Sequence, residues 1–255
     1  MITKTQAFVL RSYKFRESSL IVSLYTKECG KVKAVAKGVH RIKSKKIAHF
    51  ELFNLLELTM YEKPNRELQL VTDSSIVNYY GTIRENFDLS INATYIVELI
   101  DKMTHVHLPN DTLFRLMSTY FGSIKPSNYE LFTLAFEVKL LKLLGIFPNL
   151  THCITCKEPI DFPSGISFEQ GGALCDKPGC SDMVYDVQHI TRNEIVFLFK
   201  LIKDPFHAIG SYTFEKLDYV GIKDLINSYI AYLTDNKLKT QKVMEELRNT
   251  QLEHI

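Results

Sequence analysis

The hydrophobic period of this chain changes near Gly81, and the change divides the sequence into two kinds of secondary structure. Before it, short segments rich in Val, Leu, Tyr and Phe are separated by Gly, Pro and Asn, which is typical of β-strands joined by turns. After it, apolar residues recur every three or four positions, which is typical of helices. We therefore expect a multidomain α+β protein whose N-terminal part is all β.

Five strands are expected in the first eighty residues. Short antiparallel strands joined by polar turns suit a small closed barrel such as an OB-fold. We take residues 1–80 as one domain of this kind. The expected strand segments are 3–13, 19–26, 30–38, 50–63 and 67–80.

Residues 81–255 are expected to form an α-helical bundle domain. Its clearest helix is 127–145, because Ser127 and Glu130 make a capping-box pattern and Gly145 is a suitable C-terminal stop. Apolar residues cover so much of this helix that we expect it to be buried on several sides. The other expected helices are 89–103, 111–121, 191–203 and 223–235, the third beginning with a second capping pair, Thr191 and Glu194.

Four of the five cysteines lie between the expected helices, in an irregular Gly- and Pro-rich stretch at 151–187 with the spacing C-x2-C-x18-C-x4-C. Two close pairs of thiolates supply the ligands of a tetrahedral zinc site. Four thiolates leave no open position, so one Zn²⁺ would be structural and would stabilise the folded module. The predicted ligands are Cys153, Cys156, Cys175 and Cys180.

Other interpretations of the cysteines stay open at this point. Two disulfides would satisfy the same four residues, but they are disfavoured in a cytosolic chain. The x4 spacing of the second pair is less usual than x2, and His152 is an alternative ligand to one of the thiolates. Cys29 stands alone in the strand-rich region and is expected to be a small buried apolar residue.

The sequence favours a cytoplasmic protein. No apolar run approaches 18 residues, which disfavours a membrane span, and the N-terminal residues lack the pattern of a signal peptide. A charged fraction of 24% with 45% hydrophobic residues argues for a folded chain.

Charge is distributed unevenly along the chain. The first eighty residues carry 14 Lys and Arg against 7 Asp and Glu, so they are net +7, and the remainder is net −5. The most basic stretch is Lys31 to Lys46, which has seven Lys and Arg and no acid. In its first half cations alternate with small apolar residues, so we expect a half-buried strand with a basic outer face, followed by a basic loop.

A basic strand and loop on a barrel suit the phosphate backbone of a nucleic acid. The alternative is a solvated edge strand protected from aggregation by lysines. The sequence favours nucleic acid, and the cations of the first turn region extend the surface. The candidate nucleic-acid-binding residues are Arg11, Lys14, Arg16, Lys31, Lys33, Lys37, Arg41, Lys43, Lys45 and Lys46.

The chain has no P-loop, dinucleotide-binding, HExxH or GxSxG motif. We therefore expect a protein without catalytic activity. The alternative is a metal-dependent nuclease or another nucleic-acid enzyme, since such enzymes can use dispersed carboxylates.

Three stretches together resemble the RecO family of bacterial DNA repair proteins. Residues 9–45 (VLRSYKFRESSLIVSLYTKECGKVKAVAKGVHRIKSK) resemble its N-terminal barrel. Residues 136–156 (FEVKLLKLLGIFPNLTHCITC) and 166–175 (ISFEQGGALC) resemble its central helix and zinc segment. The order and spacing match over most of the chain and are weakest after about residue 190.

The resemblance implies a recombination mediator of the RecF pathway. Such a protein would bind single- and double-stranded DNA, anneal complementary strands and, with its partner RecR, help RecA replace single-stranded-DNA-binding protein. A mediator of this kind would work at the nucleoid. To bind the acidic, apolar C-terminal tail of single-stranded-DNA-binding protein, it would need a groove between helices with cations at its rim. Candidate rim cations are Lys139, Lys142, Lys200 and Lys203.

Overall fold

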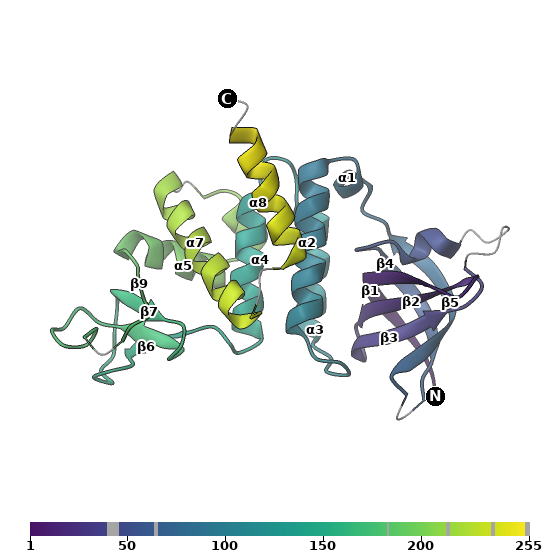
Figure 1. Cartoon of the computed structure of the whole chain (residues 1–255), viewed down its shortest axis with the longest axis horizontal. Helices are drawn as coiled ribbons and strands as arrows, with labels where there is room; N and C mark the ends of the chain where they lie inside the picture. Colours follow the sequence, from purple (N-terminus) through teal and green to yellow (C-terminus); the bar gives the residue numbers. More distant parts are fainter. Residues whose placement is uncertain (40–45, 64–65, 183, 213–214, 236–237, 253–255) are drawn as a thin grey trace. The chain divides into compact units, whose positions relative to one another are not determined.

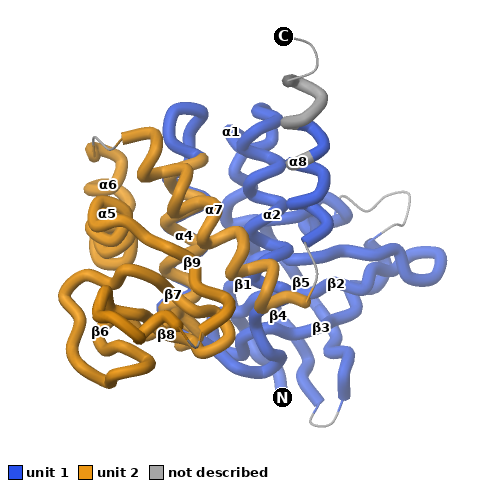
Figure 2. Tube along the Cα trace, turned by 60° about the vertical axis from the view of Figure 1, so that its left-hand side comes forward, with its two compact units in different colours: residues 1–129, 238–255 blue, residues 130–237 orange. Residues whose placement is uncertain are grey.

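The computed structural model describes residues 1–39, 46–63, 66–182, 184–212, 215–235 and 238–252 (Figure 1). The described chain forms two compact units, one of residues 1–129 with 238–255 and the other of residues 130–237 (Figure 2). These units do not test the predicted domain boundary at residue 80, which stays a prediction.

The first unit begins with a closed five-stranded barrel in the order β1-β2-β3-β5-β4, which confirms the OB-like fold. Neighbouring strands are antiparallel except β3 and β5, which run parallel and thereby correct the expectation of five antiparallel strands. The reason is that β4 pairs with both β1 and β5, so β3 meets a strand two steps further along the chain. The strands are β1 (Ile2–Phe15), β2 (Ser19–Thr26), β3 (Gly30–Ala36), β4 (Leu55–Tyr61) and β5 (Leu68–Asn78).

Helices complete the first unit and cover part of β1. The Phe8 ring, on the outer side of the barrel, lies 5.2 Å from the ring of Phe114 and 5.4 Å from that of Phe121, both on α3. Asn86 and Asn110 begin α2 and α3, since each side chain accepts a hydrogen bond from a backbone N–H of the first turn. The helices are α1 (Gly81–Arg84), α2 (Phe87–Met103), α3 (Asp111–Ser123), α8 (Lys239–Leu252) and the 3₁₀-helix η1 (Lys46–Phe50).

The second unit is built around α4 (Tyr129–Leu143). Most of α4 is buried, including Glu137 and residues on every side of the helix, which confirms its role as a central helix. The Glu137 carboxylate accepts two hydrogen bonds of 3.0 Å from Lys223 on α7, so this buried charge is paired. The helix begins at Tyr129, two residues later than the predicted cap at Ser127.

The capping box predicted at the start of α5 is confirmed. The Thr191 hydroxyl accepts a hydrogen bond from the backbone N–H of Glu194, and the Glu194 carboxylate accepts one from the backbone N–H of Thr191. The remaining helices of this unit are α5 (Arg192–Lys203), α6 (Phe206–Ile209) and α7 (Lys216–Leu233). Across the described ranges, each helix is too short or too polar to traverse a bilayer.

Candidate metal centre and nucleic-acid interface

The cysteine stretch contains a small sheet rather than wholly irregular chain. Its strands have the order β6-β8-β7-β9, with β6 at Asn149–Cys153, β7 at Gly165–Ser167, β8 at Gly172–Leu174 and β9 at Val187–His189. β6 and β8 are parallel neighbours, so Cys153 at the end of β6 and Cys175 just after β8 meet at the same edge.

A residue in the left-handed conformation lies next to the second cysteine of each pair. Lys157 (φ 64°) follows Cys156, and Gly179 (φ 84°) precedes Cys180. Glycine adopts this conformation without strain, which explains why a glycine, Gly179, stands in the second turn. The sheet and the two turns therefore bring together residues from both ends of the module.

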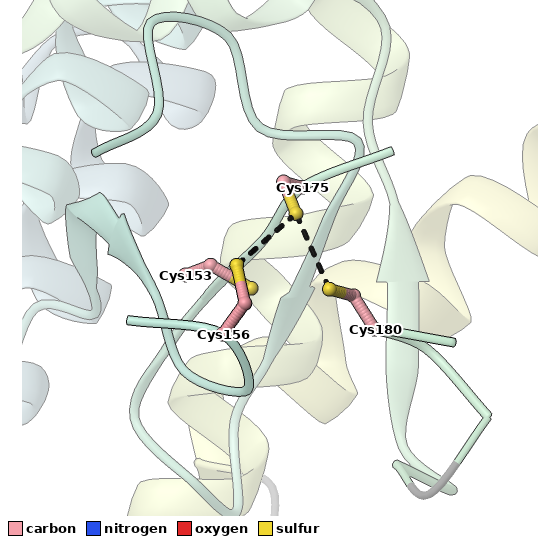
Figure 3. A group of neighbouring side chains, drawn as sticks. All are labelled: Cys153, Cys156, Cys175 and Cys180. Carbon is pink, nitrogen blue, oxygen red and sulfur yellow. Dashed lines mark hydrogen bonds between the residues drawn. The ribbon is translucent and has the colours of Figure 1, made fainter. Parts of the chain in front are cut away.

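The four predicted ligands form one cluster (Figure 3). Their sulfur atoms all lie within 4.8 Å of one another, with 3.7 Å between the Sγ atoms of Cys156 and Cys175 and 3.4 Å between those of Cys175 and Cys180. A tetrahedral ion with metal–sulfur bonds of about 2.3 Å requires sulfur separations of about 3.8 Å. The donor set and the spacing fit a four-thiolate metal site, and all four thiols are free of disulfides.

The charge on these thiols also fits a cation. Burial opposes ionisation of Cys153, but hydrogen bonds from the backbone N–H groups of Cys175, Cys156 and Thr155 lower its pKa to about 6. The pKa of Cys180 is raised to about 12 by its hydrogen bond with Cys175 and by burial. The Cys153 thiolate therefore forms readily while Cys175 and Cys180, whose pKa values are raised, resist ionisation, and a divalent cation at the centre would favour the ionised form of all four thiols.

His152 does not join the cluster. Its side chain is exposed, and its Nδ1 lies 2.9 Å from the Thr151 hydroxyl. The apolar cluster that contains the cysteines is small: among the described residues, its buried members besides Cys153 and Cys180 are Leu174 and Val184, and a few partly buried residues pack against it. A core of this size supports the expectation that bound metal stabilises the module.

The basic strand β3 alternates as predicted. Val32, Ala34 and Ala36 are buried in the barrel core, whereas Lys33 is exposed and Val35 is half-buried on the outer side. The alternation follows from the two-residue period of a strand.

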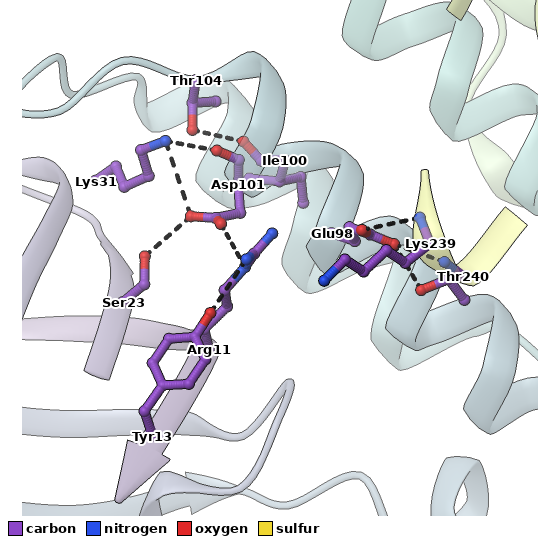
Figure 4. Close-up of polar contacts among 10 residues, drawn as sticks. All are labelled: Arg11, Tyr13, Ser23, Lys31, Glu98, Ile100, Asp101, Thr104, Lys239 and Thr240. Atoms are coloured by element: carbon purple, nitrogen blue, oxygen red, sulfur yellow. Dashed lines mark hydrogen bonds and ion pairs between the residues drawn. The ribbon is translucent and has the colours of Figure 1, made fainter. Parts of the chain in front are cut away.

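Two of the candidate DNA-binding cations are held inside the first unit by Asp101 of α2 (Figure 4). Arg11 Nε lies 2.6 Å from Asp101 Oδ2, and Lys31 Nζ donates to the Asp101 backbone oxygen at 2.6 Å. Ser23 donates a third hydrogen bond, of 3.0 Å, to Asp101 Oδ1. Burial lowers the pKa of Lys31, and the Asp101 carboxylate opposes this shift. These two cations are therefore committed to internal contacts.

The other candidates that the structure describes lie on the surface. Lys14, Lys33 and Lys37 are exposed, and the Arg16 guanidinium lies 5.1 Å from the centre of the Phe15 ring. Lys46 is exposed and pairs with Asp73 Oδ1 at 2.8 Å. Arg41, Lys43 and Lys45 lie outside the described residues.

Cys29 is half-buried against the barrel core. Its thiol donates to Glu62 Oε1 at 3.1 Å, and burial together with this carboxylate raises its pKa to about 11. Cys29 is therefore a protonated thiol, and it is half-buried where a fully buried apolar residue was expected. Asp101 was not foreseen, because its partners are some 70 to 90 residues away in the sequence and no local pattern marks it.

Comparison with known proteins covers nearly the whole chain. The family model "Recombination protein O N terminal" matches residues 1–80, and "Recombination protein O C terminal" matches residues 84–242. A solved asparaginyl-tRNA synthetase of Entamoeba histolytica matches 65% of this chain and 35% of its own at 12% identity, with a TM-score of 0.25, which is too low for a shared fold.

Curated relatives agree with the family models. Each of the following is named DNA repair protein RecO. The protein of Syntrophus aciditrophicus is 27% identical over 96% of both chains. The protein of Desulforamulus reducens is 28% identical over 98% of this chain and 97% of its own length. The protein of Alkaliphilus metalliredigens is 31% identical over 69% of this chain and 71% of its own length. The chain therefore belongs to the RecO family of DNA repair proteins.

Proposed function

We propose that this protein is a recombination mediator of the RecF pathway that binds single- and double-stranded DNA without catalytic turnover. In this role it anneals complementary strands and, with RecR, helps RecA replace single-stranded-DNA-binding protein. The observation that carries the proposal is a closed barrel that bears the exposed cations Lys14, Lys33 and Lys37. A protein with this role works in the bacterial cytoplasm, at the nucleoid.

The DNA-binding surface in this proposal is smaller than the sequence alone indicated. Arg11 and Lys31 are assigned to the Asp101 contacts, so the phosphate contacts fall to the exposed members of the candidate set. Phosphate contacts of this kind release counterions and make affinity depend steeply on salt.

The metal in this proposal is one structural Zn²⁺, held by Cys153, Cys156, Cys175 and Cys180. The thiolate donor set supports zinc over magnesium or calcium, which prefer oxygen ligands. Four protein ligands leave no coordination position for substrate, so the ion would stabilise the fold of the module and take no part in chemistry.

The second unit offers a surface for the tail of single-stranded-DNA-binding protein. Val196 and Phe199 on α5 are 40% and 38% exposed, and Val220 on the adjacent α7 is 42% exposed. Lys200 and Lys203 are exposed at the end of α5 and would form the rim. Lys139 is excluded from the rim, because its ammonium group donates to the backbone oxygens of Ile202 and Asp204. Lys142 is exposed and stays a candidate.

The experiment is a salt titration of binding to a labelled single strand. If five to seven cations engage, log K falls against log salt with a slope of roughly −4 to −5. Reversing Lys33 and Lys37 to Glu should weaken binding to all sequences alike and flatten the slope by about 1.4. Reversing Lys125 and Lys216, two exposed lysines outside the barrel, is the control with the same charge change.

Two results would contradict the proposal. Equal effects of the two double reversals would show that only net charge matters and that the barrel surface is a solvated face. New strand ends after incubation of the DNA with Mg²⁺ or Mn²⁺ would favour a nuclease instead.

A further inference from the structure

A single row of apolar side chains crosses the outer surface of the barrel. The strand registers set Tyr13 opposite Ile21, Ile21 opposite Val35, Val35 beside Leu70, and Leu70 opposite Tyr61. These five residues belong to five successive strands of the closed barrel, so they line up across the strands with a tyrosine at each end.

The row faces away from the core. The residues next to its members along the strands, including Leu20, Val22, Ala34 and Val71, are the ones that fill the barrel. Tyr13 is 51% exposed and Tyr61 is 40% exposed, and the three aliphatic members between them are half-buried. At about 4.8 Å between strands, the row follows the barrel surface for about 19 Å.

Cations border the row at its Tyr61 end and near its middle, while its Tyr13 end contacts Arg11, whose Nε is paired with Asp101. The Lys63 ammonium group lies 5.7 Å from the centre of the Tyr61 ring, and Arg11 Nη1 donates to the Tyr13 hydroxyl at 3.1 Å. Lys33 is exposed on the same face as Val35, two residues before it. Glu62 and Lys63, which follow Tyr61 in the sequence, line a cavity of about 780 Å³ together with Lys33, Arg66 and Glu67 among others.

We propose that Tyr13 and Tyr61 stack on the bases of an unpaired strand laid across the barrel. Phosphates alone would need only the cations, whereas an apolar row between cations matches a ligand with both charged and flat apolar groups. In a duplex the bases stack on one another and cannot reach the rings, so the row selects single strands. This inference rests on the proposed function and extends it from phosphate contacts to base contacts.

Single-tryptophan reporters test the stacking directly, because the chain has no Trp. The variants are Tyr13→Trp and Tyr61→Trp in the full chain, with Tyr185→Trp as the control, since Tyr185 is fully exposed in the cysteine segment. Each is titrated with oligo(dT) and with an abasic oligonucleotide of the same length. Quenching at 13 and 61 by oligo(dT), and its absence with the abasic strand or at 185, is the expected result.

Affinity measurements separate stacking from phosphate binding. Replacing both tyrosines by Ala should weaken single-strand binding about tenfold per ring and leave duplex binding unchanged, whereas replacing both by Phe should preserve both. Full single-strand affinity of the Ala variant, with unquenched reporters, overturns the stacking but leaves the proposed function standing. Reporters quenched by polyglutamate and not by oligo(dT) would assign the row to a protein partner and overturn the inference. If the unmodified protein bound neither single-stranded nor duplex DNA, the proposed function itself would be overturned.

Discussion

At the scale of single residues, Asp101 separates cations that are paired within the first unit from cations that stay exposed. It binds Arg11 and Lys31, which the charge pattern groups with the DNA-binding candidates, while Lys33 on the same strand stays exposed. Alternation along a strand predicts which side chains point outward, but it does not predict whether an outward lysine meets water or an acid. The position of Asp101 on α2 decides which of these cations is paired.

Replacing Asp101 by Ala should therefore destabilise the fold. The Lys31 side chain is only 12% exposed and would lose its carboxylate partner, at a cost of about 2 kcal/mol in the free energy of unfolding. Denaturant titration measures this loss. Asp73→Ala, which removes an ion pair of exposed Lys46, is the control and should leave the midpoint nearly unchanged. Equal midpoints for the two variants would show that the Asp101 contacts contribute nothing to stability.

At the scale of elements, the start of α8 is capped from another helix. The Glu98 carboxylate on α2 accepts hydrogen bonds from the backbone N–H groups of Lys239 and Thr240 and from the Thr240 hydroxyl (Figure 4). α8 also lies beside α2 in both overall views (Figures 1 and 2). Its polar sequence carries a weak helical pattern, which explains why sequence analysis did not foresee it.

This cap should make α8 sensitive to acid. Burial raises the pKa of Glu98, but the hydrogen bonds from Thr240 and Lys239 outweigh it, and the net shift is downward. A lowered pKa in the folded state contributes stability above the unfolded value of about 4.5, and this contribution is lost as pH falls through the folded value. We expect Glu98→Gln to cost about 1 kcal/mol at pH 7.

Hydrogen exchange of the α8 amides measures this cost. Protection in the unmodified protein should exceed that in Glu98→Gln at pH 7, and the difference should close below about pH 4. A difference that stays constant from pH 7 to pH 3 would mean that the carboxylate charge is not what holds α8.

The cysteine module is the other element for which a single stabilising contribution can be tested. Its apolar core is small, so metal should supply most of its folding free energy. Protein purified without chelator should contain one equivalent of zinc. Cys175→Ser should remove the zinc, lower the melting temperature by about 10 °C and abolish amide protection between residues 149 and 189.

Cys29→Ser is the matched control, because Cys29 lies outside the cluster and serine can still donate to Glu62. It should retain the zinc and the melting temperature. A metal-free protein with full protection in the module would rule out the structural role of zinc.

At the scale of the whole molecule, charge divides the chain between a basic end and an acidic remainder. The proposed DNA surface belongs to the first unit, and the proposed groove with Lys200 and Lys203 belongs to the second. Since the two surfaces share no residue, they should bind their partners independently and raise the local concentration of the protein at coated DNA.

Charge reversals in the full chain test this independence. Lys200→Glu with Lys203→Glu should weaken binding of a fluorescent acidic tail peptide several-fold and leave oligonucleotide affinity unchanged. Lys33→Glu with Lys37→Glu should do the opposite. Fluorescence anisotropy measures both ligands on both variants. If each double variant lost affinity for both the peptide and the oligonucleotide, the prediction of two separate binding surfaces would be wrong.

By itself, the sequence determined whatever depends on neighbours along the chain. Strand and helix periods, the capping box at Thr191 and the paired cysteines are local patterns, so the barrel, most of the helices and the four-cysteine cluster could be predicted from them. Only the tertiary structure decided what depends on partners far apart in the sequence. The parallel pairing of β3 with β5, the capture of Lys31 by Asp101, the cap of α8 by Glu98 and the row from Tyr13 to Tyr61 arise when distant segments meet, because closing those long loops is favourable only in the assembled fold.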